Sequence, residues 1–384
     1  MQEEIEAAPK KKRTMRENYI AASIIVAIIA VLGIGISIYI KNISYSEFEV
    51  LSTSKTTDSV DTQYIYFQDK LLKYSTDGVS YLDTKGAAIW SEAYNLKTPQ
   101  VATSDNYIAV GDIGGNTVYL FNEKGKVIHY DFDYPIIDFE VANQGVVAAT
   151  LENGVNSVIS MRDKNGEVVL DAQRQAENTG FPLGIALSKD AQKLAVSYIT
   201  IDGITSQNTL AFHNFSIQKA AIGTWNGSYF GDTVFPQIEF VDNDTVCAFG
   251  DNKIIIYAMR NRPSIKAEIP VEDEIKSVFY SDKYIGFITM NSGADVTESY
   301  TINVYSLAGK SILKKGFSMD YESVKFDGND IILVGDHECS IYKTNGNQKF
   351  YGSFGKNISD VIPMGKTNQY LVADPNEIKL IKIK

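Results

Sequence analysis

The sequence predicts an all-β protein: a β-propeller of about eight four-stranded blades, preceded by one transmembrane helix. Three observations lead to this prediction. A long uncharged run lies near the N-terminus, short alternating apolar runs recur throughout the rest of the chain, and a glycine-containing turn returns about every forty residues.

The uncharged run covers residues 19–40 and predicts a transmembrane helix, since a helix of this length is about 33 Å long. Lys10, Lys11, Lys12, Arg13 and Arg16 precede it, so the positive-inside rule predicts that residues 1–18 form a basic cytoplasmic tail. The propeller is then extracytoplasmic, at the cell membrane. A cleaved signal peptide is the alternative, but no small-residue cleavage pattern follows the run, and we expect an uncleaved signal-anchor.

Residues 41–59 are predicted to be a polar connector in which residues 48–51 form one strand. Beyond residue 41 the apolar residues do not keep helical spacing over three turns. Runs such as 117–122, 157–162 and 301–307 alternate instead, which is typical of strands.

A repeat organises residues 60–384. Five turns end in a glycine that supplies the positive φ of a type I turn followed by a bulge, and a large residue follows four positions later. The glycines are Gly86, Gly125, Gly166, Gly309 and Gly346, and the large residues are Trp90, His129, Leu170, Leu313 and Phe350. A period near forty with four short strands per unit predicts a propeller.

The predicted units begin near Asp61, Thr98, Tyr134, Phe181, Val234, Glu274, Tyr321 and Ser359. The last unit has only three strands, and the strand at 48–51 is free to complete it. Seven blades are the alternative, if the first unit is the completion of the last.

Two stretches carry a family resemblance. Residues 76–90 resemble a repeat of the quinoprotein-type (PQQ-like) propellers, and residues 187–196 resemble WD40-type repeats. The resemblance implies the fold and not the quinone cofactor, because Asp83 lies one residue closer to Gly86 than in the quinoprotein motif, Trp90 has no counterpart in other units, and vicinal cysteines are absent. The whole arrangement is similar to single-pass, membrane-anchored propeller proteins of unknown role in low-GC Gram-positive bacteria.

Charge and motifs restrict the function. The chain has 47 acidic and 36 basic residues and a net charge of −11, the opposite of a nucleic-acid-binding protein. Cys247 and Cys339 are predicted to be free thiols, the second partly exposed. No nucleophile elbow or phosphate-binding loop occurs, so we expect no catalytic residue, cofactor or metal site.

Four acidic turn residues, Asp112, Asp251, Asp336 and Asp374, should lie on one face of the ring. They are candidates for a cation site, but aspartate is also a common turn residue because its carboxylate accepts local backbone hydrogen bonds, and we favour this second interpretation.

The candidate partner surface is residues 223–236, which we interpret as an aromatic loop carrying Trp225, Tyr229 and Phe230. Exposed aromatic residues on a loop are typical of recognition surfaces. The competing interpretation is that these rings are buried against the end of a blade.

The sequence favours a non-enzymatic protein-interaction scaffold or sensor in the cell envelope, with an envelope protein or a peptidoglycan-associated partner and no nucleic acid. The alternatives are a propeller enzyme of quinoprotein or glycan-lyase type and a small-ligand sensor. Fold alone does not distinguish these functions.

Overall fold

The computed structural model describes residues 15–384 apart from 57, 60, 155, 176–179, 216–222, 261, 293–296 and 356. Among the described residues, the side chains of 15–21, 34, 37, 38, 40, 41, 174, 175 and 223–226 are not described. The chain divides into two compact units, Met1–Ser44 and Tyr45–Lys384.

The first unit contains the helix α1 (Met15–Asn42). Its described side chains include exposed aliphatic residues such as Ile25, Val31 and Leu32. A search of the described residues finds no helix with the length and apolar character needed to cross a bilayer.

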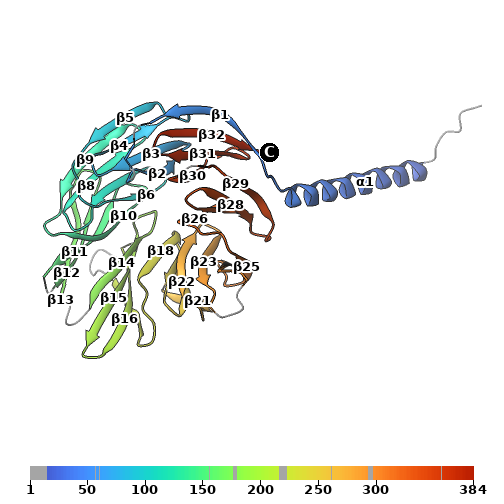
Figure 1. The fold of residues 1–384 in the computed structure, drawn as a ribbon. Coiled ribbons are helices and arrows are strands. Elements are labelled where there is room, and N and C mark those ends of the chain that lie inside the picture. The colour runs from blue at the N-terminus through green and yellow to red at the C-terminus, as the bar shows by residue number, and fades with distance from the viewer. Residues whose placement is uncertain are drawn as a thin grey trace, which may run out of the picture. The chain divides into compact units, whose positions relative to one another are not determined.

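The second unit is an eight-bladed propeller of four-stranded antiparallel blades, which confirms the predicted fold class and excludes seven blades (Figure 1). Blade 1 contains β2 (Gln63–Phe67), β3 (Lys70–Ser75), β4 (Gly78–Leu82) and β5 (Ala88–Ala93); blade 2 contains β6 (Pro99–Thr103), β7 (Ile108–Asp112), β8 (Thr117–Asn122) and β9 (Gly125–Asp131). Blade 3 contains β10 (Ile136–Val141), β11 (Val147–Asn153), β12 (Asn156–Arg162) and β13 (Val168–Gln175); blade 4 contains β14 (Phe181–Leu187), β15 (Lys193–Asp202), β16 (Thr205–Asn214) and β17 (Gly223–Phe230). Blade 5 contains β18 (Gln237–Asp242), β19 (Thr245–Phe249), β20 (Lys253–Ala258) and β21 (Ser264–Pro270); blade 6 contains β22 (Ile275–Tyr280), β23 (Tyr284–Met290), β24 (Tyr300–Ser306) and β25 (Ser311–Phe317). Blade 7 contains β26 (Ser323–Asp327), β27 (Asp330–Val334), β28 (Glu338–Lys343) and β29 (Gln348–Ser353); blade 8 contains β30 (Asp360–Pro363), β31 (Gln369–Asp374), β32 (Glu377–Ile383) and β1 (Phe48–Lys55).

The last blade is closed by the strand that follows α1, as the sequence predicts. β1 pairs antiparallel with β32, from Phe48 opposite Ile383 to Lys55 opposite Glu377, so the strand extends beyond the predicted residues 48–51. Phe48 also packs on Phe354 of blade 7, with ring centroids 5.0 Å apart. The closure leaves no unpaired edge between the first and last blades.

The predicted turns form as expected. Gly86, Gly125, Gly166, Gly309 and Gly346 all have positive φ, between 76° and 123°. The ladder shifts by one residue beside each turn, which is the bulge that follows a type I turn. The five large residues after the glycines occupy one equivalent position on the outer strands. Four are buried or half-buried. The position of His129, which it shares with large apolar residues of other units, predicts a packed core residue, but this prediction is wrong: His129 is exposed, and its ring lies 5.4 Å from that of Tyr119.

Buried side chains between neighbouring blades hold the ring together. The Trp90 ring of blade 1 stacks on Phe121 of blade 2, with centroids 5.2 Å apart. The first strands of successive blades, such as β10, β14 and β18, contact one another and therefore line the central axis.

The strand order gives the ring two distinct faces. Hairpins between the second and third strands and the links from one blade to the next lie on one face, here called the connection face. The hairpins between the first and second strands, and in blades 1–7 those between the third and fourth strands, lie on the opposite, turn face. β1 starts beside the end of β32, so the chain enters the propeller on the turn face.

Candidate functional site

The predicted aromatic loop is a strand. Residues Gly223–Phe230 form β17, the outer strand of blade 4, where we expected a loop between blades. The mixed polarity that argued against a strand is tolerated because an outer strand buries little side-chain surface. A bulge opposite Leu210 and Phe212 accommodates Gly227, whose Cβ would lie 2.3 Å from the Leu210 carbonyl oxygen.

The structure describes the side chains of two of the three candidate residues, Tyr229 and Phe230, and these two differ in exposure. Tyr229 is 66% exposed. Phe230 is half-buried against Phe235, with centroids 4.9 Å apart, and the Lys253 ammonium lies 5.5 Å from its ring. The side chain of Trp225 lies outside the described residues, so a partner surface made of all three remains a prediction.

Three of the four acidic turn residues accept hydrogen bonds from backbone amides. The Oδ1 atom of Asp112 accepts hydrogen bonds from the amides of Lys97 and Thr98 at 2.9 and 2.7 Å, and Asp374 accepts those of Asn376 and Glu377. Asp251 accepts the Val234 amide at 3.2 Å. The favoured interpretation of these three as turn residues agrees with the geometry, while Asp336 instead pairs with His337 at 2.9 Å. In the described part of the chain, no group of three His, Cys, Asp or Glu residues is arranged to hold a metal ion.

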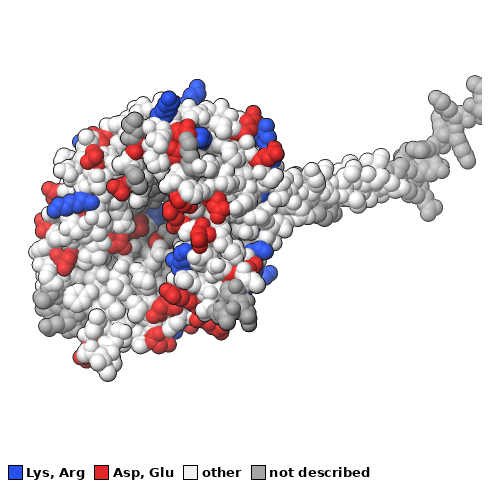
Figure 2. Space-filling model, in the orientation of Figure 1, with Lys and Arg blue, Asp and Glu red and all other residues white. Residues whose placement is uncertain are grey.

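Carboxylates also line the axis, from the first strands of the blades. Figure 2 shows a hollow in the middle of the ring with acidic side chains around it. Asp138 and Glu140 lie two residues apart on β10, so both point to the same side of that strand, and Glu239 lies on β18. Asp138 accepts the Phe139 amide at 2.9 Å and, across the blade boundary, the Ile185 amide at 3.1 Å. This carboxylate therefore links blades 3 and 4.

The low-dielectric surroundings change how these carboxyls titrate. Burial raises the pKa of Asp138 to about 6, even though two backbone amides stabilise its charged form. Burial also raises the pKa of Glu239 to about 7, against the hydrogen bonds from Gln237 and Tyr280 and together with the charge of Asp138. The pKa of Glu140 lies well above its ordinary range because of burial first and the charges of Glu239 and Asp138 second. All three shifts have burial as their largest cause and favour the neutral form of the carboxyl.

A cation balances charge elsewhere on the axis. Lys325 of β26 pairs with Asp360 of β30 at 2.6 Å, which joins blades 7 and 8. Burial raises the pKa of Asp360 although Lys325 opposes this effect.

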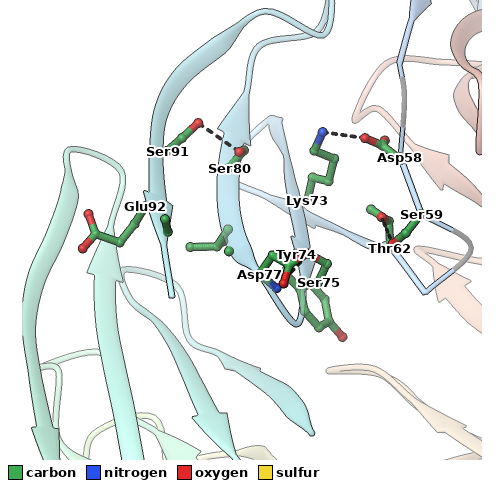
Figure 3. Close-up of a pocket in the computed structure, with 13 residues that line it drawn as sticks. Asp58, Ser59, Thr62, Lys73, Tyr74, Ser75, Asp77, Ser80, Ser91 and Glu92 are labelled. Carbon is green, nitrogen blue, oxygen red and sulfur yellow. Dashed lines mark hydrogen bonds and ion pairs between the residues drawn. The ribbon is translucent and has the colours of Figure 1, made fainter. Parts of the chain in front are cut away.

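A polar pocket of about 420 Å³ opens beside blade 1 on the connection face (Figure 3). Its walls come from the link between blades 8 and 1 and from β3, β4 and β5. Lys73 pairs with Asp58 at 2.7 Å, and Ser80 and Ser91 share a hydrogen bond of 2.9 Å. Burial alone would raise the pKa of Asp58, but the hydrogen bonds from Lys73, Thr56 and Tyr64 keep it below its usual value. The pocket is suited to a small polar ligand, and its residues are already paired with one another.

The connection face as a whole is acidic. The described residues of its hairpins and links include the acids Asp58, Asp61, Asp77, Asp133, Asp232, Asp251, Glu272, Asp273, Glu274, Glu298, Asp320, Glu322 and Asp336. Within these same described segments, Lys97 is the one lysine or arginine. On the turn face, acids alternate with basic residues, among them Lys85, Lys124, Lys189 and Lys283. The negative charge of the protein is therefore concentrated on one side.

Sequence reasoning missed the axial carboxyls and the charged face. The sequence pattern that could have indicated the axial carboxyls is Asp138-Phe139-Glu140, in which two acids alternate with an apolar residue in the first strand of a unit. The cysteines were predicted in part: both are free, but Cys339 is fully buried like Cys247 and not partly exposed, since its strand β28 is a middle strand of blade 7.

The fold is similar to solved propellers of known architecture. BamB from Moraxella catarrhalis superposes with a TM-score of 0.57 at 12% identity, covering 88% of this chain and all of BamB. Sqt1 from Chaetomium thermophilum, solved bound to the N-terminus of the ribosomal protein L10, gives 0.56 at 11% identity with the same coverage. Identities this low show the fold alone.

A search of curated proteins finds no match. The family of unknown function DUF5711, in contrast, matches residues 41–383, which is nearly the whole propeller together with its connector. The chain therefore belongs to the DUF5711 family.

Proposed function

We propose that this protein is a non-enzymatic interaction scaffold or sensor that binds a protein partner of the cell envelope. The observation that carries the proposal is the one-sided charge of the ring: the connection face is acidic over most of its hairpins and links, whereas the turn face is mixed. A fold held by blade-to-blade packing keeps such a face rigid, which lowers the ordering entropy that binding requires.

The comparison with known propellers supports a protein partner in general terms. Sqt1 shares the fold and was solved with a bound protein segment. The axial carboxyls do not favour an enzyme, because Asp138 is held by backbone amides and the described residues include no group of three His, Cys, Asp or Glu that could hold a metal ion.

The proposed location is the outer side of the cell membrane, with the N-terminal tail in the cytoplasm. This part rests on the sequence, in which residues 19–40 lack charge and five basic residues precede them.

The test is a cross-linking pull-down from membranes with the full chain. We expect a specific envelope protein to be recovered, and recovery that falls when the connection face is neutralised by Glu272→Gln, Asp273→Asn and Glu274→Gln. The matched control neutralises turn-face acids with Asp69→Asn and Asp282→Asn. Recovery of no specific partner by the wild-type chain would contradict the proposed function.

A further inference from the structure

One hairpin of the connection face differs from all the others that the structure describes there. β15 and β16 are each ten residues long, whereas the strands that form the equivalent hairpins of the other blades have five to seven. Figure 1 shows the β15–β16 hairpin extending away from the ring. Its end carries Ile201, which is 67% exposed, and Ile204, which is completely exposed. We call these two residues the hairpin tip.

The fold does not require apolar residues at this position. In the described parts of the equivalent turns of other blades, every residue except the half-buried Ile113 is polar, glycine or proline, among them Thr76, Asp77, Gly114, Asn116, Asp251, Asn252, Asp336, His337, Pro375 and Asn376. Turn residues of this kind are favoured by local hydrogen bonding. The two isoleucines bury little surface in the protein itself, so they contribute little to its stability.

One more exposed apolar residue lies at the base of the same hairpin. Phe181 of β14 pairs with Ile199, two residues before Ile201, and is 50% exposed. Paired residues and alternate residues of a strand point to the same side of a sheet, so Phe181, Ile199 and Ile201 share one face of blade 4. The apolar surface of the hairpin tip therefore continues along this face to Phe181, which is typical of an interaction surface.

The negative charge around the hairpin tip indicates which kind of partner can bind there. The hairpin tip stands on the acidic connection face, and Asp202 adjoins it. Nucleic acid and anionic lipid would be repelled by this face, and so would a second copy of the chain that presented the same surface. A segment with both apolar and basic side chains complements both features.

We propose that the hairpin tip anchors a docking surface for a basic amphipathic protein segment. Apolar side chains of that segment pack on Ile201 and Ile204, while its lysine and arginine side chains face the acids of the connection face. This inference rests on the proposed function and specifies the chemistry of the partner.

The probe is a fluorescent peptide with leucine at helical spacing and lysine elsewhere, titrated with the full chain in neutral detergent. Ile201→Ser with Ile204→Ser should weaken binding at least about tenfold, as expected when an apolar anchor is removed. The control, Val168→Ser with Val169→Ser, changes two other exposed aliphatic residues, which lie on the outer strand β13, and should bind like the wild type. Raising the salt from about 50 to about 300 mM should also weaken binding.

Several outcomes would overturn the proposal: no binding by the wild type, equal binding by the hairpin-tip variant, equal binding of a glutamate–leucine peptide, or equal binding of a lysine–serine peptide. A thermal melt that matches the wild type confirms that the variant is folded. The pull-down separates the two proposals. A partner recovered equally with the wild type and the hairpin-tip variant would leave the scaffold function intact and reject this docking site, while a wild type that recovers no partner rejects the function itself.

Discussion

Replacing Glu239 with glutamine removes a carboxylate that the fold holds in an unfavourable position. The pKa of this group rises from an ordinary value of 4.5 to about 7 in the folded chain. The folded state therefore binds more protons than the unfolded state between these values. Stability from this group is complete below about pH 4.5 and is lost as the pH rises to about 7.

The magnitude follows from the two pKa values. At about 1.36 kcal/mol per pH unit, the difference between 4.5 and about 7 limits the destabilisation to about 3 kcal/mol. Glu239 is partly accessible to solvent along the axis, so we expect about 1–3 kcal/mol. Glutamine keeps a carbonyl oxygen that accepts the Gln237 amide, which donates to Glu239 at 2.9 Å.

The assay is thermal unfolding of the wild type and of Glu239→Gln from pH 4 to pH 8. We expect equal midpoints near pH 4 and a midpoint about 1–4 °C higher for the variant at pH 8. Glu272→Gln, a change at an exposed glutamate of the connection face, is the control and should follow the wild type at every pH. Parallel profiles for Glu239→Gln and the wild type would refute the idea that burial destabilises this carboxylate.

Four further predictions concern closure, packing, thiols and topology. A chain that starts at Asp61 lacks β1 and leaves β32 unpaired, so its thermal midpoint should fall well below that of a chain starting at Lys41, and equal midpoints would show that β1 does not stabilise blade 8. Gly286→Ala places a Cβ 2.3 Å from the Phe279 ring and should lower the free energy of unfolding by about 1–3 kcal/mol in denaturant titrations. The control Gly231→Ala should have little effect, because no atom lies within 4 Å of its Cβ. Similar losses for both variants would exclude the ring contact as the cause. Burial raises the pKa of Cys247 to about 12 and also raises that of Cys339. Iodoacetamide should therefore label neither thiol at pH 8 until guanidinium unfolds the chain. Rapid labelling of the native protein would contradict the burial of the thiols. Protease added to spheroplasts should digest the propeller if it is extracytoplasmic, and protection of the full chain alongside a digested outer-surface control would argue against that location.

Much of the fold could be predicted because its signals are local. The glycine of each repeated turn needs positive φ wherever it occurs, and strand alternation depends on neighbours along the chain, so the unit boundaries near Thr98, Tyr134 and Ser359 coincide with the starts of β6, β10 and β30. The closure by residues 48–51 followed from counting strands in the last unit. The repeat period, the turn residues and the number of strands per unit can all be read from the sequence of one chain.

The candidate site depended on information that the order of residues does not contain. Tyr229 and Phe230 are adjacent, yet one is exposed and the other is half-buried, because Phe230 faces Phe235 of the following link and Lys253 of blade 5, and only the ring brings Lys253 beside it. Asp138 and Glu239 belong to different blades, and the burial that raises their pKa values arises only when the first strands converge on the axis. The sequence by itself determined the strands, their period and the closure, since these follow from local backbone preferences. Only the tertiary structure decided which acids line the axis, which crowd the connection face and which isoleucines remain exposed on it, because burial and electrostatic fields are set by neighbours that are distant along the chain.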